Sequence, residues 1–174
     1  FKERLESIIG NFKMDNLITE DKKECFGLFQ ESYNPIKLHV DAGFNFKDLI
    51  YKQTLLPLSE YGETVIFKNR FYGISTSFTK DKKELLENNP ENYKKGKNER
   101  SNEHLKIYSN KSFDINNYKK YLKHEDIDNL KGLEVEHVYK WKLGDLFIFD
   151  RTHLHCSSCN IKNKKIGLAT FTKK

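Results

Sequence analysis

Four residues, in two parts of the sequence, are of the types that bind a transition metal. His39 and Asp41 lie two positions apart in the first part, and His153 and His155 lie two apart in the second. On a β-strand, residues two apart point to the same side, so His39 and Asp41 can meet at one ion. Two imidazoles and one carboxylate make a facial triad that leaves positions open on Fe(II) for a cosubstrate and dioxygen. Strand periodicity does not choose between His153 and His155.

A second pair of the same kind, His124 and Asp126, receives a different prediction. It lies at the start of an expected helix over residues 125–131. On a helix, residues two apart diverge by about 200°, so these side chains do not converge on one ion. Acidic residues in a first helical turn are favoured by the helix dipole. We therefore predict that this pair is solvent-exposed surface.

The elements expected around these residues are mainly strands, with flanking helices. Alternation of apolar and polar residues predicts strands over residues 36–41, 52–58, 64–67, 134–141, 145–149 and 166–171. Helical spacing and capping residues predict helices over residues 20–31, 114–121 and 125–131. We expect one domain over residues 1–174, in which the polar segment 80–131 is an insertion that forms a lid over the site.

Composition argues against several classes of protein. The 174 residues carry 31 Lys and Arg against 25 Asp and Glu, but five of the lysines lie in residues 162–174, where there is no acid. Acidic residues match the basic residues elsewhere, so nucleic acid is not indicated as a partner. No run approaches the roughly 18 to 20 apolar residues of a membrane span, which argues against a membrane partner. Three cysteines are few and odd in number, which predicts a reducing, cytoplasmic location.

Taken together, the motifs resemble the non-heme iron, 2-oxoglutarate-dependent oxygenases, particularly the phytanoyl-CoA dioxygenase-like and prolyl-hydroxylase-like branches. The resemblance covers residues 36–172 and rests on these features in order: His39-Val40-Asp41, the strands at 53–58 and 63–67, Gly144-Asp145 with Phe149, His155, and Lys165 ten positions later. It implies a double-stranded β-helix, a cupin-like jelly roll with the metal in its mouth. Only 38 residues precede His39 and the first residue is Phe1, so we expect an N-terminally trimmed chain.

The resemblance implies that His39, Asp41 and His155 bind Fe(II). It places His153 and Arg151 just behind these ligands.

The same resemblance implies that Lys165 pairs with the distal carboxylate of 2-oxoglutarate. Lys164 is a rival for this role, and the usual Ser or Thr two residues after the basic anchor is here Gly167. Further candidates for hydrogen bonds to 2-oxoglutarate, if their strands line the barrel, are Tyr51, Gln53, Thr54 and Thr170.

The function implied is oxidation, by hydroxylation or a related reaction, of an unidentified small-molecule or peptide substrate. Three alternatives stay open. A jelly-roll module could bind a metal or small ligand without turnover, and a docking protein could use residues 80–131 as its surface. A compact zinc site could use His153, His155, Cys156 and Cys159, although four ligands within seven residues are cramped for a tetrahedron and leave His39 and Asp41 unexplained.

Overall fold

The computed structural model describes residues 1–18, 21–41, 50–73, 75–86, 100–108 and 111–174. The fold is mainly β, with two antiparallel sheets. The larger sheet contains β1 (Lys13–Met14), β4 (Leu28–Ser32), β5 (Ile50–Pro57), β10 (Phe147–Asp150) and β12 (Lys165–Lys173). The smaller sheet contains β6 (Glu63–Arg70), β9 (Val135–Lys140) and β11 (His153–Ser157). Two short pairs join β2 (Leu17–Ile18) to β3 (Glu24–Cys25) and β7 (Ser77–Phe78) to β8 (Arg100–Ser101).

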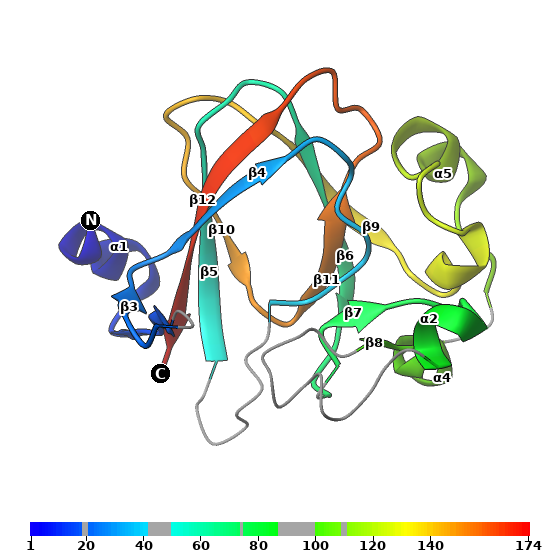
Figure 1. Cartoon of the computed structure of the whole chain (residues 1–174), viewed down its shortest axis with the longest axis horizontal. Helices are drawn as coiled ribbons and strands as arrows, with labels where there is room; N and C mark the ends of the chain where they lie inside the picture. Colours follow the sequence, from blue (N-terminus) through cyan, green and yellow to red (C-terminus); the bar gives the residue numbers. More distant parts are fainter. Residues whose placement is uncertain (19–20, 42–49, 74, 87–99, 109–110) are drawn as a thin grey trace.

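The two sheets face one another, and the helices lie outside them (Figure 1). In the larger sheet, β12 pairs with β5 on one side and with β4 and β1 on the other, while β10 pairs with β5. In the smaller sheet, β6 lies between β11 and β9. Helix α1 (Lys2–Ile9) lies beyond the larger sheet, and the other helices lie beyond the smaller one: α2 (Lys82–Leu86), α4 (Glu103–Ile107), α5 (Ile115–Tyr121) and the 3-10 helix η1 (Ile127–Leu130).

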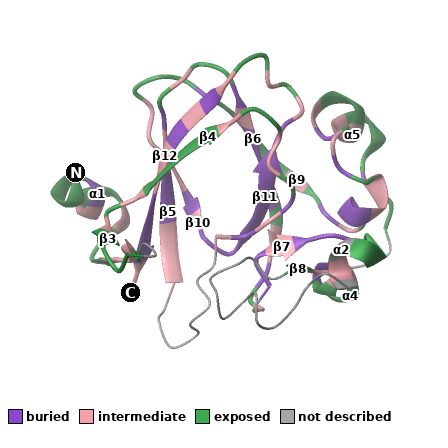
Figure 2. Ribbon diagram, in the orientation of Figure 1, coloured by how far each residue is buried: buried purple, intermediate pink, exposed green. Residues whose placement is uncertain are grey.

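The main apolar core lies between the smaller sheet and the helical segment that covers its outer face. Strand β11 is buried along its whole length (Figure 2). Its residues alternate between two environments. Leu154 and Cys156 join this core, whereas His155 and Ser157 line the space between the sheets. Because neighbouring residues of a strand point to opposite faces, the core and the polar site share the same strand.

The polar segment 80–131 contributes directly to this core. Phe113, Leu122 and Leu130 belong to the same buried cluster as Phe67 of β6 and Leu154 of β11. The described part of the segment therefore packs behind the smaller sheet and not between the sheets. Its remaining residues, 87–99 and 109–110, lie outside the described part of the chain, so the lid stays a prediction.

Most of the expected strands are present within a few residues of their predicted bounds. The predictions at 52–58, 64–67, 134–141, 145–149 and 166–171 correspond to β5, β6, β9, β10 and β12. Residues 36–41 form isolated bridges at His39 but make no continuous strand. The helix expected at 114–121 is α5, where the Asp114 side chain accepts a hydrogen bond from the Asn117 N–H.

The helix predicted over residues 20–31 is wrong. Its described residues contain β3 and β4, and β4 pairs with β12 along the run from Lys165 to Ala169. Phe29, expected to pack inward, is 60% exposed. Local propensity is a weak signal, and the backbone hydrogen bonds to a neighbouring strand override it here.

The prediction of exposed surface for His124 and Asp126 is correct for only one of the two residues. Asp126 is half exposed and caps η1, whereas the His124 side chain is only 13% exposed. Burial lowers the pKa of His124 to about 4.

Among the described residues, no helix is long and apolar enough to cross a membrane.

We predict that Leu130→Ala lowers the free energy of unfolding by about 2–5 kcal/mol, because it opens a cavity in the buried cluster. The matched control Ile107→Ala removes an exposed apolar side chain of the same polar segment, and should change stability by less than about 0.5 kcal/mol. Urea denaturation followed by circular dichroism measures both. Equal, small effects would contradict the assignment of this segment to the core.

Candidate metal centre

His39, Asp41 and His155 form the one cluster in the described part of the chain that has the geometry of a metal site. Their potential ligand atoms all lie within 4.8 Å of one another. His155 Nε2 is 3.2 Å from Asp41 Oδ2, and His39 Nε2 is 3.9 Å from Asp41 Oδ1. The two imidazole rings have centroids 4.1 Å apart. The three residues are therefore close enough to bind one metal ion.

Backbone pairing brings the two histidines together across 116 positions of sequence. The His39 N–H donates to the His155 carbonyl at 2.9 Å, and the His155 N–H donates to the His39 carbonyl at 3.0 Å. Residues that exchange both hydrogen bonds lie directly opposite one another in an antiparallel ladder. Asp41, two residues after His39, then points to the same side, as its strand parity predicts.

The segment that contains His39 is fixed on its other side as well. The Val40 N–H donates to the Thr76 carbonyl at 2.9 Å, and the Phe78 N–H donates to the Leu38 carbonyl at 3.1 Å. The buried Glu125 carboxylate accepts a hydrogen bond from the Leu38 N–H at 2.6 Å. Three long-range hydrogen bonds thus hold a segment that is too short and irregular to count as a strand.

Hydrogen bonds also determine which nitrogen of each ring faces the cluster. His39 Nδ1 lies 2.7 Å from the Lys37 carbonyl, and His155 Nδ1 lies 2.9 Å from the His153 carbonyl. A carbonyl only accepts, so both Nδ1 atoms carry the proton. The Nε2 atoms then face Asp41, and a cation is needed between them: a proton on His155, or a metal ion in its place.

The ionisation states of the cluster favour metal binding at neutral pH. Burial, with a smaller contribution from the charge of His155, lowers the pKa of His39 to about 4. Burial alone would raise the pKa of Asp41, but His155, His39 and the hydrogen bond from Gln53 outweigh it and hold that pKa below its usual range. His39 and Asp41 are therefore already deprotonated at pH 7, as metal ligands must be.

Two neighbours hold Asp41 in place. Gln53 Nε2, on β5, donates to Asp41 Oδ2 at 2.8 Å, so the predicted site residue Gln53 does reach the cluster. Arg151 Nε donates to the Asp41 backbone carbonyl at 2.8 Å, and the Arg151 side chain is itself buried. Arg151 thus lies behind the candidate ligands, as expected.

A small cavity of about 50 Å³ lies beside the cluster, between the two sheets. It is lined by His39, Asp41 and His155, and also by Lys165 of β12. A larger cleft of about 560 Å³ shares His39 and Asp41 with this cavity. The cluster therefore lies between an inner cavity and a wider outer cleft.

Lys165 is a buried cation in the wall of the inner cavity. It is 5% exposed, its Nζ donates to Ser157 Oγ at 2.9 Å, and it lies over the Trp141 ring at 4.2 Å from the centroid. No carboxylate of the described residues pairs with it. Burial lowers the pKa of Lys165 to about 8, which records the cost of keeping this ammonium charged.

The neighbouring lysine lies on the other side of the strand. Lys164 Nζ is 3.5 Å from Glu31 Oε2, and its side chain is 41% exposed. Between the two lysines, it is Lys165 that lines the cavity.

The structure does not bring Tyr51, Thr54 and Thr170 to the cavity. The Thr54 and Thr170 hydroxyls hydrogen-bond each other at 2.7 Å, one strand position away from the residues of β5 and β12 that line it. The Tyr51 hydroxyl donates to the Ile9 carbonyl at 2.7 Å. Neighbouring positions on a strand face opposite ways, which explains why Gln53 reaches the site and Thr54 does not.

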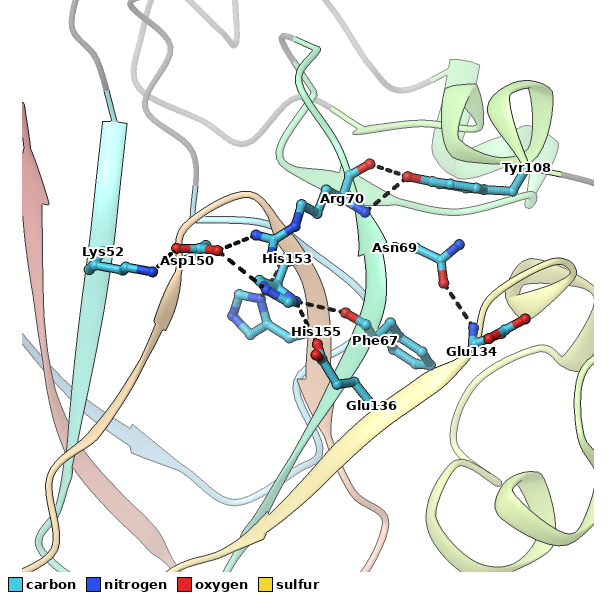
Figure 3. A network of polar contacts seen from close by, with 10 residues as sticks. All are labelled: Lys52, Phe67, Asn69, Arg70, Tyr108, Glu134, Glu136, Asp150, His153 and His155. Atoms are coloured by element: carbon cyan, nitrogen blue, oxygen red, sulfur yellow. Dashed lines mark hydrogen bonds and ion pairs between the residues drawn. The ribbon is translucent and has the colours of Figure 1, made fainter. Parts of the chain in front are cut away.

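His153 shares the strand parity of His155 and yet belongs to a different network (Figure 3). Its Nδ1 hydrogen-bonds the Phe67 carbonyl at 2.8 Å, and its Nε2 is 3.7 Å from Asp150 Oδ2. Asp150 also pairs with Lys52 of β5 and Arg70 of β6. The register of β11 against β6 shifts between His153 and His155, so an irregularity in the pairing separates the two rings.

The compact zinc site is not formed. Cys156 points into the apolar core, where burial raises the pKa of its thiol. Cys159 Sγ lies near the Lys120 carbonyl. The four residues of that alternative do not form one cluster, because Cys156 belongs to the apolar core and His155 lies with His39 and Asp41.

Two residues that contact the Lys165 ammonium in the cavity wall, Ser157 and Trp141, were not among the predicted site residues. Ser157 follows His155 by two positions on the same strand, so its parity was a signal that could have identified it. Trp141 Nε1 donates to Thr64 Oγ1 at 2.9 Å, which sets the ring beside Lys165. No feature of the local sequence connects Trp141 to Lys165, because 24 positions separate them.

No protein-family model, no curated protein and no solved structure matches the chain.

We predict that His39→Ala, Asp41→Ala and His155→Ala each abolish measurable Mn(II) binding, because each removes a ligand. Substitution of a residue that hydrogen-bonds to a metal ligand can lower metal affinity by roughly 10- to 100-fold, and His153→Ala should lower Mn(II) affinity by less than that. Electron paramagnetic resonance of free Mn(II) measures the affinity. Loss of binding in His153→Ala with retention in His155→Ala would show that the wrong histidine is assigned.

We also predict that Lys165→Met stabilises the protein at pH 7 by about 1–3 kcal/mol, because it removes a buried charge while conserving length. The folded-state pKa of about 8 lies below the ordinary value of 10.5, so wild-type stability should rise as the pH increases from 8 to 10.5. This rise should be absent in Lys165→Met and present in the exposed control Lys164→Met. Denaturant midpoints across this pH range test both expectations, and identical profiles for all three proteins would contradict them.

Proposed function

We propose that this chain is an Fe(II)- and 2-oxoglutarate-dependent oxygenase that hydroxylates or otherwise oxidises a substrate bound in the outer cleft. The observation that carries the proposal is that Lys165, a buried cation without a carboxylate partner among the described residues, shares one cavity with two histidines and an aspartate. The histidines and aspartate fit a divalent metal. The lysine fits an anionic ligand beside that metal.

The donor set of the cluster suits Fe(II). Two imidazole nitrogens and one carboxylate oxygen are the ligands of the facial triad, and they leave one side of an ion available to other ligands. Bound there, Fe(II) supplies the chemistry by which dioxygen oxidises 2-oxoglutarate to succinate and carbon dioxide, and the substrate to its product. Within the chain, His39, Asp41 and His155 hold the ion, and Gln53 and Arg151 hold Asp41.

Charge balance supports a dianionic cosubstrate. One carboxylate neutralises only half the charge of a divalent ion, so the ion and Lys165 together leave two positive charges in a buried site. A dianion such as 2-oxoglutarate cancels both, and buried charges need such compensation. Its proximity would raise the pKa of Lys165 and keep the ammonium charged at neutral pH.

The side chains around Lys165 suit a carboxylate. The Lys165 ammonium and the Ser157 hydroxyl, 2.9 Å apart, can both donate to one carboxylate group. In this role Ser157 would supply the hydroxyl that the resemblance expects two positions after Lys165, where the chain has Gly167. The Trp141 ring limits the cavity on this side, because it lies against both Lys165 and Gly167.

The architecture and the cleft are consistent with the proposal. Two facing antiparallel sheets with a candidate metal site between them agree with a double-stranded β-helix of the jelly-roll type. The outer cleft of about 560 Å³ is within the size range of small-molecule sites, which runs from about 300 to 1,000 Å³. Its contact with His39 and Asp41 would expose a substrate to the metal. Lys165 lies in the inner cavity, apart from the lining of that cleft.

Anaerobic titration with Fe(II) and then 2-oxoglutarate tests the proposal. We predict a metal-to-ligand charge-transfer absorption band that requires both additions. Lys165→Ala should lower the affinity for 2-oxoglutarate by roughly 30-fold to several thousand-fold, since a charge pair lost from a buried site costs about 2–5 kcal/mol. The affinity for Mn(II) should stay nearly unchanged. Lys165→Arg should recover part of the affinity, because guanidinium and ammonium differ in reach and geometry.

Lys164→Ala is the matched control, and its 2-oxoglutarate affinity should equal that of the wild type. Metal binding without any band or any effect at Lys165 would contradict the oxygenase and favour a non-catalytic metal-binding module. A band without succinate formation under air would favour the same alternative.

A further inference from the structure

The buried Arg151 side chain connects Asp41 to a part of the chain that is remote in sequence. Its Nε donates to the Asp41 carbonyl at 2.8 Å, and its Nη1 donates to Asp15 Oδ2 at 2.6 Å and to the Thr172 carbonyl at 3.1 Å. The guanidinium also lies over the Phe171 ring, 5.1 Å from its centroid. Arg151 is 4% exposed, so the side chain that makes these contacts is almost completely shielded from solvent.

Asp15 is itself held against β12. Its backbone N–H donates to the Phe171 carbonyl at 2.9 Å, directly after β1 pairs with the end of β12. Its second carboxylate oxygen, Oδ1, lies 3.4 Å from Lys173 Nζ. The carboxylate that orients Arg151 is therefore fixed by the larger sheet.

We propose that Asp15 and Arg151 act as a positioning pair for the metal ligand Asp41, so that the N-terminal strand β1 is part of the metal centre. This inference rests on the proposed metal site. Neither residue contacts the ion. The pair acts through the Asp41 backbone, while Gln53 acts on the Asp41 side chain.

The chemistry of the guanidinium group explains why position 151 requires arginine and not lysine. A planar guanidinium presents several donors in a rigid fork, so one side chain holds the Asp41 carbonyl and the Asp15 carboxylate at a fixed mutual position. Lysine would keep the charge but has no second, rigidly placed donor. Without the Arg151 guanidinium, the Asp41 backbone is free to move. Metal binding must then also order Asp41, and this cost lowers the affinity for the ion.

Three variants test the pair: Arg151→Lys, Asp15→Asn, and the control Arg70→Lys. Arg70 makes the same kind of ion pair, with Asp150, but does not touch Asp41. For each protein, Mn(II) affinity is measured by electron paramagnetic resonance, the visible spectrum is recorded with Co(II), and metal-free stability is measured in urea. The Co(II) spectrum reports the geometry of the ligands, which a loss of stability alone would not alter.

We expect Arg151→Lys and Asp15→Asn to lower the affinity for Mn(II) by about 10- to 100-fold and to change the visible spectrum with Co(II). Arg70→Lys should lower metal-free stability and leave both metal readouts as in the wild type. Should Arg151→Lys fail to fold, Asp15→Asn alone carries the test, because Asp15 is partly exposed. Wild-type metal affinity in a folded Asp15→Asn protein would overturn the inference, whereas a wild-type chain that binds no Mn(II) would overturn the metal site itself.

Discussion

The candidate site depends on one antiparallel bridge, in which His39 and His155 exchange both backbone hydrogen bonds. This bridge sets two imidazoles side by side and, through strand parity, brings Asp41 to the same face. It belongs to a segment without a continuous strand of its own, so its position relies on β11, on the pairing with residues 76–78 and on the buried Glu125 carboxylate. Each of these supports comes from a distant part of the chain.

Strand β11 joins the stability of the protein to its chemistry. One face of the strand contributes Leu154 and Cys156 to the apolar core, and the other presents His155 and Ser157 to the cavity. Core packing is tight and tolerates little movement, so the side that binds no ligand keeps the functional side rigid. The helical segment behind the smaller sheet thus supports the site without bordering the inner cavity.

The buried Lys165 ammonium works against stability, since an unpaired charge in a protein interior is costly. The surrounding residues reduce that cost only in part, through the Ser157 hydroxyl and the face of the Trp141 ring. Gly167 is adapted to the same arrangement, because a Cβ there would lie 2.8 Å from the Trp141 ring. Such a costly charge next to the candidate metal ligands supports the proposal of an anionic ligand that pairs with Lys165.

Alternation along a strand is a local property that short segments express directly, so the sequence by itself predicted five of the strands and the convergence of His39 and Asp41 on one side. The choice of His155 and of Lys165 followed from the resemblance to the iron, 2-oxoglutarate-dependent oxygenases. Only the tertiary structure decided the rest. Pairing with β12 made strand β4 of residues expected to be helical, a register shift separated His153 from His155, and the outer face of the larger sheet received Thr54 and Thr170. Trp141 and the pair of Asp15 with Arg151 reached the site through contacts between segments that are distant in sequence. Such contacts depend on register and packing across the whole fold, which no local pattern encodes.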